Sequence, residues 1–214
     1  MIHYDRTLRT IAVLLAILAG FVDAIGFLRL GGMFVSFMSG NSTRLAIGLA
    51  TRSDAALVAA SLIAAFVGGV VGGSLLSAWL PNHRKAAVLA SVAALLALAA
   101  TLSQLGLDHA ALPVIACAMG CANTVFQRDG EVSVGVTYMT GALVKTGQRI
   151  GAAFLGGDRW GWLPYLSLWI GLVSGGVLGA LCYGVIGMDG LWVAALAAAL
   201  LAAVAGRTPR PTSR

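Results

Sequence analysis

Long uncharged apolar runs make up most of this chain. Asp, Glu, Lys and Arg are all absent from residues 55–82, 86–107, 109–127, 160–188 and 190–206. An uncharged apolar run of about 18 residues or more is long enough to cross the hydrocarbon core of a bilayer as a helix. Several such runs in one chain of 214 residues predict an all-α, polytopic membrane helix bundle whose main partner is the lipid bilayer.

The runs divide the chain into consecutive apolar segments, of which the second and sixth are interrupted by polar residues. The second contains the polar stretch Ser39–Arg44, and the sixth contains Thr140–Lys145. We call these stretches the first and second polar motifs. The apolar segments are 8–29, 33–50, 56–80, 86–106, 110–127, 132–155, 162–187 and 190–206.

The two interrupted segments match each other. "MSG" at 38–40 parallels "MTG" at 139–141, and a cation follows the glycine four residues later in each copy, at Arg44 and Lys145. Upstream, "GFVD" at 20–23 parallels "GCAN" at 120–123. This shared order predicts an internal duplication.

A pair of glycine rows extends the match downstream. "GGVVG" at 68–72 parallels "GGVLG" at 175–179. The pseudo-repeats would then be 8–106 and 110–206, within a single transmembrane domain 1–214 that ends in a short basic tail, 207–214. Small residues at a four-residue spacing let helices approach closely, so we assign the rows to helix packing, either within the chain or in a homo-oligomer. The residues concerned are Gly68, Gly69, Gly72, Gly175, Gly176 and Gly179.

The charges favour one of two topologies. If all segments cross the membrane, each half has four spans and the halves are parallel. If the second and sixth segments are broken or re-entrant, about six full spans remain, in a 3+3 inverted repeat. Only the six-span arrangement puts Arg84, Lys85, Arg128 and Arg159 in the cytoplasm together with both termini, as the positive-inside rule requires. We therefore expect a multi-pass protein of the bacterial inner (cytoplasmic) membrane with both termini in the cytoplasm.

Composition narrows the function classes. The chain is 59% hydrophobic and 10% charged, with a net charge of +6 whose basic residues gather at segment ends. No polar basic face is present, which argues against nucleic-acid binding. The 3 Cys and 3 His are scattered inside apolar runs or near segment ends. We therefore expect neither a metal site nor a cofactor, and no catalytic residue.

The first polar motif has the chemistry of a helix break. Gly40 permits unusual backbone angles, and Asn41, Ser42 or Thr43 could cap a new helix over 44–50. A helix N-terminus beside a cation favours an anion. Two interrupted segments in matching halves are also the best sequence indication of a transporter's central site. Alternatively, Arg44 extends to the headgroups at a simple helix end.

Asp23 is an isolated carboxylate within the first apolar segment. Such a group should be neutral, paired or facing water. It either pairs with Arg44 or Lys145, or carries a proton or cation during transport. Its counterpart Asn123 keeps the polarity without the charge. The predicted solute-binding residues are Asp23, Ser39, Asn41, Arg44, Asn123, Thr140 and Lys145.

Residues 20–50 resemble the YoaK-like family of small bacterial membrane proteins of unknown function. The family pattern is an Asp in the first helix, a glycine turn with Phe, and then Met-Thr-Gly-Asn. Here it maps to Asp23, Gly31–Phe34 and Met38–Asn41, with Ser39 in place of Thr. The resemblance implies an integral inner-membrane protein, loosely described as permease-like, with no established substrate.

Two functions remain after these exclusions. The first is a small transporter or channel for a small polar or anionic solute. The second is a structural or accessory membrane subunit in which the motifs only break helices. An enzyme is not expected, because no metal-binding, nucleophile or phosphate-binding motif occurs in the sequence.

Overall fold

In the part of the chain that the structure describes, eight α-helices correspond to the eight apolar segments. The computed structural model describes residues 6–128, 131–132 and 137–207; the predicted tail beyond Arg207 lies outside this range. Apart from the 3₁₀ turn η1 (Gly187–Asp189) and a short hairpin of β1 (Gln127–Arg128) and β2 (Glu131–Val132), the described elements are helices. They are α1 (Arg6–Arg29), α2 (Met38–Thr51), α3 (Ala55–Trp79), α4 (Arg84–Gln104), α5 (Asp108–Ala122), α6 (Met139–Phe154), α7 (Leu163–Ile186) and α8 (Gly190–Arg207).

Four stretches of the described chain are long and apolar enough to cross a membrane. Three coincide with α1, α3 and α4, and the fourth, 163–207, contains α7, η1 and α8. Helix α5 is apolar but has only 15 residues. The predicted helical membrane bundle is thereby confirmed.

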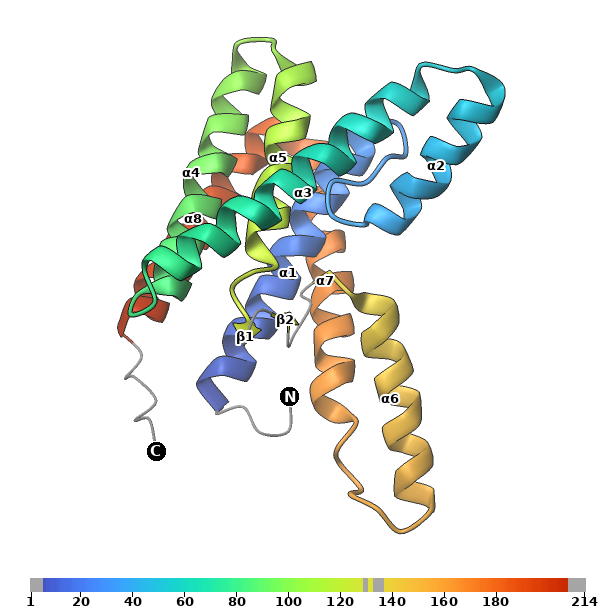
Figure 1. Cartoon of the computed structure of the whole chain (residues 1–214), viewed down its shortest axis with the longest axis vertical. Coiled ribbons are helices and arrows are strands. Elements are labelled where there is room, and N and C mark those ends of the chain that lie inside the picture. Colours follow the sequence, from blue (N-terminus) through green and yellow to red (C-terminus); the bar gives the residue numbers. More distant parts are fainter. Residues whose placement is uncertain (1–5, 129–130, 133–136, 208–214) are drawn as a thin grey trace.

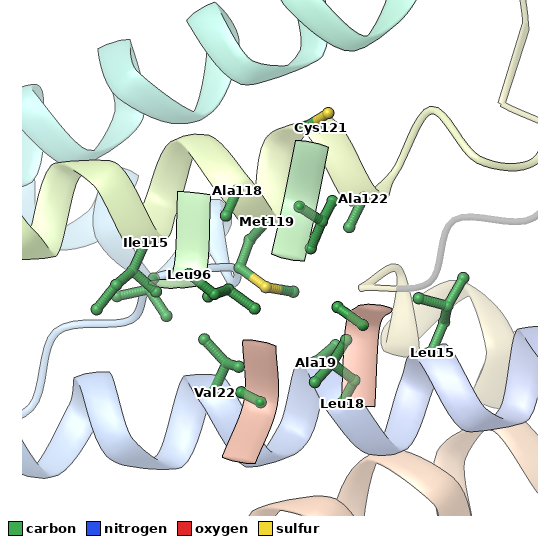
Figure 2. Close-up of a cluster of buried hydrophobic side chains, with 14 of the residues drawn as sticks. Leu15, Leu18, Ala19, Val22, Leu96, Ile115, Ala118, Met119, Cys121 and Ala122 are labelled. Atoms are coloured by element: carbon green, nitrogen blue, oxygen red, sulfur yellow. The ribbon is translucent and has the colours of Figure 1, made fainter. Parts of the chain in front are cut away.

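The long helices pack in pairs that join the two halves of the chain. Helix α1 lies against α7, α3 against α5, and α4 against α8. Their apolar faces enclose a core in which side chains of α1 meet those of α4 and α5 (Figure 2). Figure 2 labels, among others, Leu15, Leu18, Ala19, Val22, Leu96, Ile115 and Met119.

Glycines set the distance of closest approach in two of these pairs. A Cβ added at Gly69 would overlap the Cys117 carbonyl oxygen in the α3–α5 pair, and one at Gly175 would overlap that of Ile17 in the α1–α7 pair. Backbones can come this close only where a side chain is missing.

The other glycines of the two rows do not all share this role. Gly179 lies against the backbone of Phe21. A Cβ added at Gly176 would lie 3.8 Å from the Gly20 carbonyl oxygen, which is an ordinary contact. By contrast, an added Cβ at Gly68 or Gly72 would meet nothing within 4 Å. In α3 the contacting row is therefore Gly69 with Gly73, one residue beyond the positions that the sequence pattern emphasised.

Helices α2 and α6 differ from the others in their path. Each packs mainly on the helix that follows it, α2 on α3 and α6 on α7. Both begin near the middle of the molecule and run to opposite ends (Figure 1). The interrupted segments therefore start in the interior and lead outwards.

Candidate functional site

A central cavity of about 430 Å³ lies where α2 and α6 begin. The segment before each helix and its first turn form most of the wall, and Phe66 of α3 completes it. The two polar motifs are thus brought to one place although they are about a hundred residues apart. The lining residues are Ser36, Phe37, Met38, Ser39, Phe66, Thr137, Tyr138, Met139, Thr140 and Gly141.

Helix α2 begins earlier than the sequence suggested. We predicted a helix over 44–50 capped by Asn41, Ser42 or Thr43, but α2 starts at Met38 and these residues lie within it. Ser42 and Thr43 donate hydrogen bonds to carbonyl groups one turn back. The break occurs at Gly31 and Gly32, whose positive φ angles of 61° and 112° suit glycine.

Asp23 holds the segment that leads into α2. Its Oδ1 accepts hydrogen bonds from the backbone N–H groups of Val35 and Ser36 at 2.8 and 2.9 Å, and its Oδ2 accepts one from the Ser36 hydroxyl at 2.9 Å. The predicted pairing with Arg44 or Lys145 is wrong, because the donors to Asp23 come from Val35 and Ser36 of the loop before α2.

Asn123 has the equivalent position in the second half. Its Oδ1 accepts a hydrogen bond from the Thr137 hydroxyl at 3.1 Å, and its Nδ2 donates to the Met119 carbonyl at 2.9 Å. Ser36 and Thr137 both line the central cavity. Asp23 and Asn123 are therefore not among the lining residues themselves, but each is hydrogen-bonded to a residue that lines the cavity.

Asn41 is fully buried and already engaged. Its Oδ1 accepts from the Phe34 N–H at 3.0 Å, and its Nδ2 donates to the Phe34 carbonyl at 2.6 Å. The side chain thus fixes the loop against α2. A buried amide with these partners has little left to offer a solute.

Of the predicted site residues, only Ser39 and Thr140 line the cavity directly. Arg44 lies farther along α2, where its guanidinium packs against Gly32. The Lys145 ammonium is 5.7 Å from the centre of the Tyr165 ring, a cation–π contact. The two cations therefore sit about two turns into their helices, away from the wall.

Paired aromatic and methionine residues in the wall were missed by the sequence reasoning. Phe37 and Met38 face the cavity from one half, and Tyr138 and Met139 from the other. The signal was present in the repeated order aromatic–Met–hydroxyl–Gly at 37–40 and 138–141. Phe66 had no comparable signal.

A second cavity, of about 580 Å³, lies at the end of the bundle where α4 joins α5. An ion pair between Arg29 and Asp108 forms part of its wall. Ser103 donates a hydrogen bond to Asp108 at 2.7 Å. The hydrogen bonds from Arg29 and then Ser103 lower the pKa of Asp108, which is outside the four candidate spans, below its ordinary value of 3.8.

Metal-binding groups are not gathered anywhere in the described chain. Within residues 6–128, 131–132 and 137–207, no group of three His, Cys, Asp or Glu is placed to hold an ion. The described residues that line the central cavity include four with hydroxyl groups on or before the first turns of α2 and α6: Ser36, Ser39, Thr137 and Thr140.

The long apolar helices define the class: a multi-pass helical membrane protein. Residues 11–204 match the family described as Protein of unknown function (DUF1275), and the chain belongs to this family. This agrees with the resemblance seen at residues 20–50.

One relative is similar along nearly its whole length. The UPF0700 transmembrane protein RA0705 of Rhizobium meliloti (strain 1021) is 37% identical over 198 residues, which are 92% of this chain and 85% of that protein. No solved structure matches the chain.

Proposed function

We propose that this protein moves a small polar or anionic solute through the central cavity between its two halves. The observation that carries the proposal is the meeting of the α2 and α6 N-termini at one cavity. Each N-terminus carries a positive partial charge and N–H groups without intrahelical partners. Neither helix has a side-chain cap hydrogen bond at its start. The Met38 and Met139 N–H groups donate to the carbonyl groups of Ser36 and Thr137, so the donors that we propose for a solute are the N–H groups of the next residues, Ser39 and Thr140.

The wall is suited to passage and not to tight fixation. Ser39 and Thr140 offer hydroxyl groups, those of Ser36 and Thr137 are bonded to Asp23 and Asn123, and the remaining described wall is aromatic, thioether and glycine. Among the described residues that line it, none has a carboxylate, imidazole or ammonium group. This part of the wall supplies no general base for catalysis, which supports our proposal of a transport protein and not an enzyme.

An inverted internal repeat would account for the paired contacts. In this proposal α1 to α4 correspond to α5 to α8. The α1–α7 pair then corresponds to α5–α3, and the Asp23–Ser36 contact to Asn123–Thr137. The equivalent contacts of Gly69 and Gly175 also correct the alignment of the glycine rows by one residue.

Six spans with both termini in the cytoplasm fit this arrangement. The spans would be α1, α3, α4, α5, α7 and α8, with α2 and α6 entering only halfway. Figure 1 shows that α1 begins and α8 ends at the same end of the bundle, where the α3–α4 and α6–α7 connections also lie.

The charges are distributed accordingly. The end with the α1 start carries Arg84, Lys85 and Arg159. That end also carries Asp158, beside Arg159. At the opposite end Asp108 pairs with Arg29, and Asp189 accepts a hydrogen bond from Gln104. The positive-inside rule then assigns the more basic end to the cytoplasm of a bacterial inner membrane.

The test is uptake by purified protein in liposomes, using labelled taurine, ethanesulfonate, glycine and acetate as probes. Filling the cavity by Ser39→Leu with Thr140→Leu should reduce uptake at least tenfold, because both side chains line the wall. Ser42→Leu, which makes the same serine-to-leucine change at a residue of α2 that is not among those lining the cavity, is the control. Uptake that is equal in all three proteins, or absent in the wild type, would favour the accessory-subunit function.

A further inference from the structure

Three cations gather at one end of the α4–α8 pair. Helix α4 begins with Arg84 and Lys85, and α8 ends with Arg207. The two ends lie side by side in Figure 1, and a Cβ added at Gly206 would be 3.6 Å from the side chain of Ala86. Cations from the two halves of the chain thus form one basic surface, which we call the basic patch.

The cations of the basic patch form no ion pair with any carboxylate that the structure describes. Within the described ranges, the ion pair found is that of Arg29 with Asp108, at the opposite end of the bundle. Helix α4 also has no acidic residue in its first turn and no side-chain cap hydrogen bond at its start. Cations in a first turn face the positive end of the helix dipole, which is unfavourable unless an anion neutralises them.

A tryptophan marks the depth at which the basic patch lies. Trp79 ends α3 and is 74% exposed, and residues 80–83 connect it to Arg84 at the start of α4. An exposed tryptophan at the end of an apolar helix of this length is typical of the level of the lipid headgroups. The short connection therefore keeps the basic patch at this level.

Both helices continue from the basic patch with exposed apolar side chains. On α8, Leu200 and Val204 are 60% and 49% exposed, and on α4 the side chains of Ala90 and Ala94 are exposed. A soluble anion would contact the cations alone. A phospholipid can place its phosphate on the cations and its acyl chains along the helices, so cations beside an apolar surface match the two parts of one molecule.

From these observations we propose that the basic patch is a binding site for an anionic phospholipid. The phosphate lies between the start of α4 and the end of α8, where Arg84, Lys85 and Arg207 neutralise it. The acyl chains lie along the exposed apolar side chains of the two helices. The bound lipid thereby bridges the two halves of the chain. The site is independent of what the central cavity carries, because these cations are not among the residues described as lining that cavity.

Equilibrium binding to the purified full-length protein in detergent tests the proposal. The probes are phosphatidylglycerol and phosphatidylcholine that carry the same dansyl-labelled acyl chain, and the readout is energy transfer from the tryptophans. The wild type should bind phosphatidylglycerol more tightly by on the order of tenfold or more, because each Lys or Arg near an anionic surface contributes roughly a fivefold factor. The triple variant Arg84→Gln, Lys85→Gln and Arg207→Gln should lose most of this preference.

A second triple variant makes the same change of net charge elsewhere. Arg52→Gln, Arg149→Gln and Arg159→Gln remove three exposed cations that lie after α2, on α6 and in the α6–α7 connection. This control should keep the preference of the wild type. If the first triple variant does not purify as a folded protein, the double variant Arg84→Gln with Arg207→Gln decides, since it keeps the partly buried Lys85.

Competition with inorganic phosphate distinguishes a lipid site from a site for the free anion. Sodium phosphate should displace phosphatidylglycerol no better than sodium chloride of the same ionic strength, because phosphate lacks the apolar contacts. Stronger displacement by phosphate would overturn the proposal in favour of a soluble anion. Equal binding of the two lipids by the wild type, or the same loss of preference in both triple variants, would also overturn it.

Discussion

At the scale of single residues, buried polar side chains determine where the interrupted segments turn. Asp23 gathers the N–H groups of Val35 and Ser36, and Asn41 holds both backbone groups of Phe34. The sequence marked Asp23 as exceptional because it is an isolated carboxylate in an apolar run. The sequence did not predict the hydrogen-bond partners of Asp23, because these lie on a loop that folds back against α1.

The first prediction concerns the hydrogen bonds of Asp23. Asp23→Ala leaves two buried N–H groups without an acceptor, at a cost of about 1–3 kcal/mol for each group. Asp23→Asn keeps an acceptor oxygen and should be much less destabilising. Thermal unfolding in detergent should rank the proteins in that order. Equal unfolding midpoints for wild type and Asp23→Ala would contradict the assigned role.

At the scale of helices, the apolar segments predicted their number and approximate bounds well. The start of α2 was predicted six residues late, because Asn41, Ser42 and Thr43 have the composition of a cap. In fact a glycine turn breaks the chain earlier, and the hydroxyl groups bond within the helix. Composition alone does not distinguish a cap residue from a first-turn residue.

The second prediction uses two adjacent glycines of α3. Gly69→Ala places a methyl group onto the Cys117 carbonyl and should force α3 and α5 apart, at a cost of about 1–3 kcal/mol or more. Gly68→Ala meets nothing within 4 Å, and alanine is the better helix former by about 1 kcal/mol. Thermal unfolding should therefore fall for the first variant only. A similar loss in both would show that the packing row is wrong.

At the scale of the whole molecule, the halves meet along helix pairs and through polar contacts at one end. The sequence predicted that the two polar motifs belong together from their shared order. It did not predict which helices pair across the halves, because α3 and α5 are apolar on nearly all sides and pattern alone gives them no direction.

The third prediction is a pH dependence of the Arg29–Asp108 contact between the halves. The pKa of Asp108 is lowered in the folded protein, so the contact stabilises the fold above the ordinary value of 3.8 and is lost as the pH falls below it. Asp108→Asn should lower the stability at pH 7 by less than about 1 kcal/mol, because the pair is partly exposed. The difference from wild type should shrink as the pH falls below 3.8. A difference that is constant from pH 7 to pH 3 would mean that the ion pair is not its cause.

The central claim is that a wet cavity lies between the N-termini of α2 and α6, and cysteine accessibility measures it most directly. In a protein whose three native cysteines are replaced by alanine, Ser39→Cys and Thr140→Cys should both react with a membrane-impermeant, positively charged methanethiosulfonate in liposomes. Val177→Cys, on an exposed face of α7 that would meet lipid, should not react. Labelling of both cavity positions is the result that this structure predicts. If the cysteines at positions 39 and 140 were as unreactive as the cysteine at position 177, this result would contradict the claim.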